Sequence, residues 1–412
     1  MSNIFTKPRG TQDMLYDKAR SYNKIVDILN SVATNYGASP IQIPMYEESR
    51  LFKRGVGNST DIVMKETFDL ANKGDHDYSL RPEFTAGIMR AIIENKLYAS
   101  PDLPLKLYYS GSIFRYERPQ QGRYREPHQW GIEFTDLNLD DSTVAEAILV
   151  MVDGLKALGI DPIIKLNNLG GDISRSNYRK ALVDYFTPLK DKLCTDCQKR
   201  LELNPLRILD CKVPEDHELV LKAPLLKDYL IDEDKKKFAK LLELLDSCNV
   251  KYTLDDKLVR GLDYYTGPVF EAYEANHLEL GALGGGGRYD KLMETLGGPA
   301  FNGVGFSFGL DRLLLTLGDT YKFEGPNLMV IVSEEDKKEL FNLKHELRNL
   351  GISVLSPTEG KKLNGALKMA DRLKVKNILF KTPEGYQLKN LVTREQKAID
   401  INNTQEIAEL VK

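Results

Sequence analysis

The sequence contains no run of about 18 apolar residues, which is the length that a helix needs to span a bilayer. Its first ten residues also lack the apolar stretch of a secretory signal peptide. The chain has 412 residues, of which 42% are hydrophobic and 28% are charged, enough for two or three separate cores. We therefore expect a soluble, multidomain, cytoplasmic protein with no membrane partner.

Cysteine is scarce, and its four positions are too few for a disulfide framework in a chain of this size. Reduced thiols are expected. Cys194 and Cys197 have C-x-x-C spacing, with Cys211 and His217 downstream, so that a Cys₃His zinc site is formally possible. Small buried cysteines in a helical segment explain the same pattern without metal, and we assign no metal ligand.

Several catalytic signatures are also absent. The chain has five histidines, no Ser/His/Asp order, no H-E-x-x-H and no Walker loop, so nothing supports a hydrolase, a zincin or a P-loop enzyme. A net charge of −3 gives no bulk attraction to nucleic acid. The segment 326–412 carries 15 basic against 12 acidic residues, and it is therefore the more basic part. A solvated helix face explains that excess equally well.

The residue patterns change along the chain, and these changes predict its domains. Apolar residues at helical spacing over 13–36 predict a helix that Gly37 ends, and strand-like runs follow. Residues 172–248 have the charged, amphipathic pattern of a helical insertion. A turn-rich segment predicts a boundary near Gly325, and alternating strands and helices then predict an α/β domain. Its helices are expected over 334–350 and 363–373.

Residues 114–134, FRYERPQQGRYREPHQWGIEF, place four arginines and three acidic residues between two apolar segments. If these segments are antiparallel strands, Gln129, Gly131 and Glu133 share one face, and the glycine leaves room for a small ligand. Arg115 can offer a planar fork to a phosphate or a carboxylate. The pattern predicts a polar floor under a pocket, and a solvent-facing strand pair is the alternative.

The segment 258–273, LVRGLDYYTGPVFEAY, contains Arg260, Asp263, Tyr264 and Tyr265 close together in sequence, with glycines nearby. Paired tyrosines offer rigid walls with hydroxyl tips, which suit an aromatic or heterocyclic ligand. An edge strand with two core tyrosines would give the same pattern.

Two glycine-rich stretches complete the candidates. The run 284–287, followed by Arg288 and Tyr289, would let a backbone approach a ligand closely, although a plain turn would also use it. Residues 304–318 predict a strand of small residues that leads into a helix with Arg312 in its first turn. Such a helix start favours phosphate, and a capped core helix with a surface arginine is the alternative.

Taken together, these segments resemble the class II aminoacyl-tRNA synthetases and, among them, the histidyl-tRNA synthetase family. Motifs 1, 2 and 3 of the class are similar to residues 36–57, 114–133 and 303–315. The segments that resemble the histidine family in particular are 258–267 (LVRGLDYYTG), 284–290 (GGGGRYD), 7–13 (KPRGTQD) and 80–86 (LRPEFTA).

The resemblance implies an α+β catalytic domain on a mainly antiparallel sheet over residues 1–325, with the helical insertion at 172–248, and an anticodon-binding α/β domain over 326–412. It also implies a homodimer. The expected activity joins L-histidine to ATP, with Mg²⁺ bridging the phosphates, and then transfers the histidyl group from the adenylate to the 3′ end of tRNA(His).

The resemblance further implies roles for individual residues. Arg115 and Arg260 would be catalytic and would grip the α-phosphate from opposite sides. Arg115, Arg123 and Arg312 would bind ATP. The expected histidine-binding residues are Glu83, Thr85, Arg115, Gln129, Glu133, Arg260, Tyr264, Tyr265 and Tyr289.

Two other functions share the same core. The regulatory subunit of ATP phosphoribosyltransferase is a non-catalytic relative, but it lacks the terminal domain, whereas this chain keeps Arg260 and 87 residues after the predicted boundary. A class II synthetase for proline, threonine or glycine would leave the two tyrosines and the aspartate of 258–267 without a use.

Overall fold

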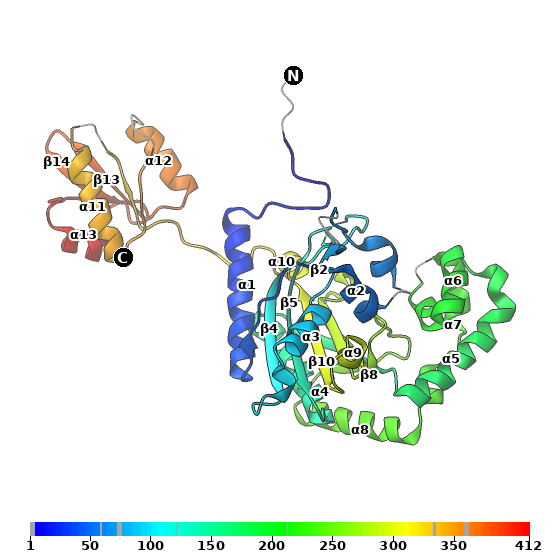
Figure 1. The fold of residues 1–412 in the computed structure, drawn as a ribbon. Coiled ribbons are helices and arrows are strands. Elements are labelled where there is room, and N and C mark those ends of the chain that lie inside the picture. Colours follow the sequence, from blue (N-terminus) through cyan, green and yellow to red (C-terminus); the bar gives the residue numbers. More distant parts are fainter. Residues whose placement is uncertain are drawn as a thin grey trace. The chain divides into compact units, whose positions relative to one another are not determined.

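The computed structural model describes residues 5–57, 60–71, 76–120, 122–211, 213–332, 335–357 and 362–412. The chain separates into two compact units, Met1–Thr320 and Tyr321–Lys412, and each is described by itself (Figure 1). The sequence predicted a boundary near Gly325, a few residues further along the chain.

The first unit is built on a sheet of eight strands. Neighbouring strands are antiparallel, except that β1 pairs with β4 and β6 with β7 in parallel. The predicted mainly antiparallel sheet is therefore confirmed. The strands in spatial order are β1 (Ser39–Pro40), β4 (Leu105–Ser112), β5 (His128–Asp136), β10 (Asn302–Gly309), β9 (Gly284–Tyr289), β8 (Thr266–Glu274), β6 (Pro162–Asn168) and β7 (Tyr252–Leu254).

Two long helices, α1 (Tyr16–Asn35) and α4 (Asp141–Ala157), cover one face of this sheet. Trp130 of β5 points to this side, where its indole N–H donates to Asn30 Oδ1 of α1 at 2.9 Å. The residues on either side of Trp130 therefore face the opposite way. The opposite face is the one that carries the predicted polar side chains.

The other elements of the first unit are short. They are β2 (Tyr46–Glu48), paired with β3 (Tyr78–Leu80), and the helices α2 (Ser49–Val56), η1 (Ile62–Glu66), α3 (Thr85–Glu94), η2 (Leu97–Ala99), η6 (Leu278–Leu280), α9 (Leu292–Thr295) and α10 (Leu310–Leu317). None of the described helices combines the length and the apolar character needed to cross a lipid bilayer.

The segment between β6 and β7 is the predicted insertion, and its described residues form only helices, turns and irregular connections. It leaves the sheet at β6 and returns in the neighbouring parallel strand β7. Its helices are drawn in green in Figure 1 and are α5 (Asp172–Phe186), η3 (Thr187–Lys192), α6 (Thr195–Leu203), η4 (Pro205–Asp210), α7 (Pro214–Leu221), η5 (Leu226–Tyr229) and α8 (Asp232–Ser247).

The second unit has helices on both faces of a five-stranded sheet, as an α/β domain should. Leu328 and Val330 pack with α11 and α13, whereas Met329 packs with α12 on the other side. In sheet order the strands are β12 (Val354–Leu355), β11 (Leu328–Val330), β13 (Asn377–Thr382), β14 (Gly385–Asn390) and β15 (Gln396–Ala398). The helices are α11 (Lys337–Asn349), α12 (Leu363–Arg372) and α13 (Thr404–Val411).

This unit differs from its prediction in two respects. Helix α11 begins at Lys337 rather than at 334, a position that lies outside the described residues. The strands β13, β14 and β15 form an antiparallel meander that the sequence did not predict. Only Tyr386 and Leu388 of β14 pack on the core, and all three residues of β15 are exposed, so that the apolar pattern of these strands is short and weak.

Helix α1 ends where the sequence predicted. Gly37 has a φ of +73°, its N–H donates to Thr34 O at 2.9 Å, and Ala38 N–H donates to Ala33 O at 3.1 Å. This is a Schellman cap, which favours glycine because other residues are strained in the left-handed region.

We expect Gly37→Ala to lower the free energy of unfolding of the first unit by about 1 kcal/mol, because space around Gly37 is open and only the backbone strain changes. Gly37→Asn should cost less, since asparagine tolerates this conformation. Urea unfolding monitored by far-ultraviolet circular dichroism measures both. Equal stability of the alanine variant and the unchanged protein would contradict the cap.

Candidate active site

On the polar face of the first sheet, glycines alternate with polar side chains in one cross-strand row. This row runs through Tyr109 of β4, Gly131 of β5, Ser307 of β10, Gly285 of β9 and Glu271 of β8. Directly paired residues of neighbouring strands have side chains close enough to touch. A large side chain in such a row can therefore lie over a glycine beside it.

The glycines make room for protein side chains. A Cβ atom on Gly305 would overlap the Glu133 carboxylate, and one on Gly303 would overlap the Tyr289 ring. Two glycines of the run 284–287 also lie against side chains of the site. Gly285 lies under the Arg260 guanidinium, and Gly287 lies under the Tyr265 ring.

One prediction about glycine is therefore wrong in detail, and one alternative is excluded. The space at Gly131 holds the Tyr109 side chain, because that tyrosine is its direct partner across β4 and β5. The run 284–287 is the strand β9, not a turn, and of its four residues Gly285 lines the cavity. The glycines shape the site by letting other side chains pack against the backbone.

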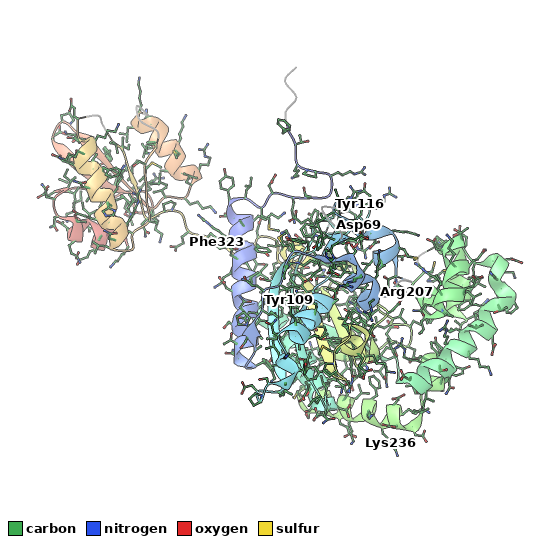
Figure 2. The ribbon with its side chains drawn as sticks, in the orientation of Figure 1. Asp69, Tyr109, Tyr116, Arg207, Lys236 and Phe323 are labelled. Atoms are coloured by element: carbon green, nitrogen blue, oxygen red, sulfur yellow. The ribbon has the colours of Figure 1, made fainter. Side chains whose placement is uncertain are left out.

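These side chains surround a cavity of about 280 Å³. The predicted residues that line it are Glu83, Thr85, Arg115, Arg123, Gln129, Glu133, Arg260, Tyr264, Tyr265 and Tyr289. They come from segments far apart in the sequence, and the fold brings them together. A solvent-facing strand pair is excluded for β4 and β5, because Glu133 is only 2% exposed. Tyr109 of β4 also lines the cavity and is labelled in Figure 2.

Glu133 is the hydrogen-bonding centre of the cavity floor. Its Oε1 accepts from the Thr85 hydroxyl at 2.8 Å and from the Tyr109 hydroxyl at 3.3 Å, and its Oε2 accepts from the Tyr289 hydroxyl at 2.5 Å. Burial raises the pKa of Glu133 to about 8, and the Glu83 carboxylate adds to this, although the three donors oppose it. At neutral pH this side chain therefore holds a proton much of the time.

Glu83 is buried at the start of α3, where its two oxygens accept from the backbone N–H groups of Thr85 at 2.6 Å and Ala86 at 2.8 Å. These groups have no partner inside the helix, so that the carboxylate satisfies them. Burial raises the pKa of Glu83, while these hydrogen bonds and the charge of Arg115 counteract it. Glu83 thus fixes the start of α3 and the Thr85 hydroxyl that contacts Glu133.

Arg260 lies over the sheet from the segment before β8 and forms an ion pair with Glu271. Burial lowers the pKa of Arg260, but the nearby Glu271 and Tyr265 more than offset this. Within the described part of the chain, its buried Nε has no hydrogen-bond partner. A buried donor without a partner is costly, and it would be satisfied by an anionic ligand.

The other arginines form a second cationic group. Arg115 follows β4, and its Nε donates to Pro82 O at 2.8 Å. Arg123 is the most exposed and pairs with Glu117 at 3.8 Å. Arg312, in the first turn of α10, does not line the cavity and donates to Ala282 O. Burial lowers the pKa of Arg312, and the charge of Arg123 lowers it further, so that these two guanidinium groups repel each other.

The three predicted tyrosines form an aromatic wall. The ring centroids of Tyr264 and Tyr265 are 4.8 Å apart, and those of Tyr264 and Tyr289 are 5.6 Å apart. Burial raises the pKa of all three phenols, so that they stay neutral donors. Asp263 does not join them. Its carboxylate accepts from Asn204 of the insertion at 2.9 Å, which makes it a link between two parts of the unit.

Sequence reasoning missed several residues of the cavity. Tyr109, Asp210, Glu271 and Ser307 line it and were not singled out. Glu271 did carry a signal, since it is the acidic residue between the apolar positions of PVFEAY, facing opposite to its neighbours. Asp210 carried none, because the helical insertion brings it to the cavity.

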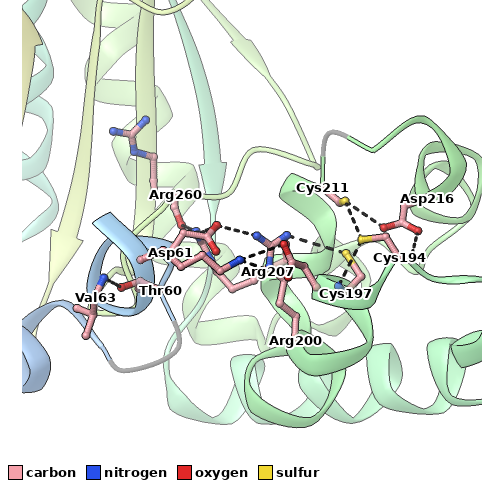
Figure 3. A network of polar contacts seen from close by, with 12 residues as sticks. Thr60, Asp61, Val63, Cys194, Cys197, Arg200, Arg207, Cys211, Asp216 and Arg260 are labelled. Atoms are coloured by element: carbon pink, nitrogen blue, oxygen red, sulfur yellow. Dashed lines mark hydrogen bonds and ion pairs between the residues drawn. The ribbon is translucent and has the colours of Figure 1, made fainter. Parts of the chain in front are cut away.

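The cysteines of the insertion also differ from the sequence pattern. The sulfur atoms of Cys194, Cys197 and Cys211 gather with a carboxylate oxygen of Asp216, all within 4.8 Å of one another. His217, the formal fourth ligand of the predicted pattern, is not part of this group. Figure 3 shows the three thiols and Asp216 at the end of a polar network that leads to Arg260.

Known proteins resemble this chain over most of its length. A family model described as histidyl-tRNA synthetase matches residues 10–170 and 199–313. The histidine–tRNA ligase of Bacillus licheniformis is 43% identical over 91% of this chain and 90% of its own, and that of Bacillus subtilis is 42% identical over 90% and 89%. The crystal structure of apo Staphylococcus aureus histidyl-tRNA synthetase covers 99% of this chain and 100% of its own, with 31% identity and a TM-score of 0.81.

The pKa of Glu133 gives a testable pH dependence. Its carboxyl has an ordinary pKa of 4.5 when unfolded and about 8 when folded, so that between these values the folded protein binds more protons. Stability should therefore fall as pH rises from about 5 to 8, by up to about 1.4 kcal/mol for each pH unit. Glu133→Gln should remove this part of the slope, measured by urea unfolding at several pH values.

Glu294→Gln is the matched control, because Glu294 is an exposed glutamate of α9. It should keep the slope of the unchanged protein. If Glu133→Gln also kept that slope, the raised pKa of Glu133 would be refuted.

Proposed function

Because the chain belongs to the histidyl-tRNA synthetase family, we propose that it is a histidine–tRNA ligase that activates histidine with ATP and then transfers the histidyl group to tRNA(His). The observation that carries this proposal is the convergence of ten predicted side chains on one cavity. The cavity offers carboxylates and hydroxyls on its floor, aromatic walls and guanidinium groups above. This combination suits an amino acid with a polar ring joined to a phosphate.

In the proposed complex the imidazole lies among Glu133, Tyr265 and Tyr289. Because the Glu133 carboxyl holds a proton at neutral pH, it can transfer this proton to a neutral imidazole. The transfer forms a carboxylate and an imidazolium together, so that neither buried charge is left without an opposite charge beside it. An apolar side chain of similar shape could not accept this proton and would leave buried polar groups unpaired, which gives strong discrimination. Glu83, Thr85 and Gln129 would receive the α-ammonium group, and Tyr264 would line the site.

Activation joins a carboxylate oxygen of histidine to the α-phosphorus of ATP and breaks the bond from that phosphorus to the oxygen that leaves with pyrophosphate. Negative charge builds on the α-phosphate oxygens. Arg115 and Arg260 would neutralise it from two sides, and the unpartnered Nε of Arg260 is a free donor for this purpose. Glu271 would hold the Arg260 side chain in place over Gly285 before ATP binds.

The rest of ATP would lie near Arg123 and Arg312. Two guanidinium groups that repel each other are stabilised when a polyphosphate binds between or beside them. Mg²⁺ would enter with the triphosphate. Glu271 and Asp210 line the cavity and offer oxygen atoms of the kind that Mg²⁺ prefers.

The remaining roles belong to the same proposal. The unit 321–412 would bind the anticodon, and its basic excess over 326–412 agrees with an RNA partner. Residues 36–57 would form a homodimer interface, and the exposed apolar side chains of Met45 and Tyr46 within this segment support that role. The protein would act in the cytoplasm.

The proposal is tested by the exchange of labelled pyrophosphate into ATP in the presence of each of the twenty amino acids. Histidine alone should support exchange. Arg260→Ala should lower the exchange rate about 10²- to 10³-fold, because it removes a preorganised donor to the transition state. Charging of tRNA(His) by the same protein would then establish the second step.

Arg288→Ala is the control, because Arg288 pairs with Asp290 at 2.8 Å and does not line the cavity. Its exchange rate should stay close to that of the unchanged protein. A protein that binds histidine but supports exchange with no amino acid would refute the ligase function. The regulatory subunit of ATP phosphoribosyltransferase would then be the better description.

A further inference from the structure

The cysteine group of the insertion has the arrangement of a closed metal site. Cys194 caps the start of α6, Cys197 lies in its first turn, and Cys211 follows η4. Asp216 lies in the first turn of α7. Each offers one ligand atom, and these four atoms lie within 4.8 Å of one another (Figure 3).

The distances agree with a tetrahedral centre. Zinc–sulfur bonds of about 2.3 Å place two sulfur atoms of one tetrahedron about 3.8 Å apart. Cys194 Sγ and Cys211 Sγ are 3.9 Å apart, and Cys211 Sγ is 3.0 Å from Asp216 Oδ2. A disulfide would instead require a sulfur–sulfur distance of about 2.05 Å. The spacing leaves room for one small cation among the four atoms.

Neighbouring groups hold the ligand atoms in place. The backbone N–H of Cys197 donates to Cys194 Sγ at 3.4 Å, and that of Cys194 donates to Asp216 Oδ1 at 2.8 Å. The second contact leaves Oδ2 to face the sulfur atoms. The Arg200 guanidinium lies 4.0 Å from Cys197 Sγ and would offset the negative charge of a thiolate-rich centre. Such supporting hydrogen bonds are typical of protein metal sites.

We propose that these four side chains hold one Zn²⁺ ion as a structural site. Soft thiolate ligands in a tetrahedral arrangement select zinc over magnesium or calcium. Three cysteines and an aspartate fill all four positions, so that the ion has no open position for catalysis. The site joins α6, η4 and α7, which are short helices with few buried residues of their own.

The site is connected to the proposed catalytic arginine. Arg200 donates to Asp61 Oδ2 at 2.7 Å and to the backbone oxygen of Arg207 at 3.4 Å. Arg207 is buried, and its guanidinium donates to the backbone oxygen of Arg260 at 3.1 Å. Figure 3 shows this sequence of contacts from Cys197 to Arg260. Zinc would therefore also fix the backbone from which Arg260 reaches the cavity.

The first test uses the full-length protein, purified under reducing conditions. We expect about one zinc ion per chain by plasma emission spectroscopy. After removal of this metal, Co²⁺ should produce the thiolate charge-transfer band and the strong visible absorption of a tetrahedral sulfur-rich centre, and Zn²⁺ should abolish both. Folded protein that binds neither metal and whose cysteines all react with a thiol reagent would overturn the proposal. A Cys194–Cys211 disulfide would also overturn it.

The variants identify the ligands. Cys197→Ser and Cys211→Ser should lose the metal, whereas Cys248→Ser should keep it, because Cys248 is exposed and lies outside the group. Asp216→Asn should weaken Co²⁺ affinity at least about tenfold, and His217→Asn should leave it unchanged. The reverse result for the last pair would overturn the ligand assignment. If a cysteine variant does not fold, the Co²⁺ titration of the unchanged protein still decides.

Amide hydrogen exchange tests the connection to Arg260. Removal of the metal should speed exchange in 194–216 and also in 258–265, if the contacts through Arg200 and Arg207 transmit the change. A change restricted to 194–216 would leave the metal site intact and refute its link to the cavity. Neither result depends on catalytic activity, so that the inference stands or fails apart from the ligase function.

Discussion

The contact between the Glu133 carboxylate and the backbone of Gly305 is the constraint on which the rest of the site depends. No side chain larger than hydrogen fits at Gly305 while Glu133 keeps its place. Glu133 in turn accepts hydrogen bonds from the hydroxyl groups of Thr85, Tyr109 and Tyr289. The hydroxyl groups fix the aromatic wall, and Thr85 connects the floor to the start of α3. The strand register thus determines which polar atoms meet in the cavity.

Much of this site followed from the sequence, because two-residue alternation in a strand does not depend on distant parts of the chain. Gln129 and Glu133 could be placed on one face in this way, opposite Trp130. What fills the space over Gly131 could not be deduced, since this depends on the register between β4 and β5, which brings Tyr109 there. Local patterns give the face of a residue, and only the pairing of strands gives its neighbour.

The same limit explains the errors in the insertion and the second unit. The C-x-x-C spacing pointed to His217, but helix α7 begins at Pro214 and turns Asp216 toward the thiols instead. Asp263 looked like a member of the tyrosine group, yet it contacts Asn204 of the insertion. The strand β15 was missed because its three residues are exposed and carry no apolar pattern. For Asp263, a contact distant in sequence overrides the local pattern.

The parallel pairing of β6 and β7 determines how easily the insertion between them can change in length. The insertion begins and ends in adjacent strands, so that the ends of the inserted chain are already held together by the sheet. The entropy of closing a loop grows only with the logarithm of its length, and most of that cost is met once the ends are fixed. A segment placed there can lengthen, shorten or be exchanged between relatives with little effect on the sheet, which makes this edge a natural place for new modules.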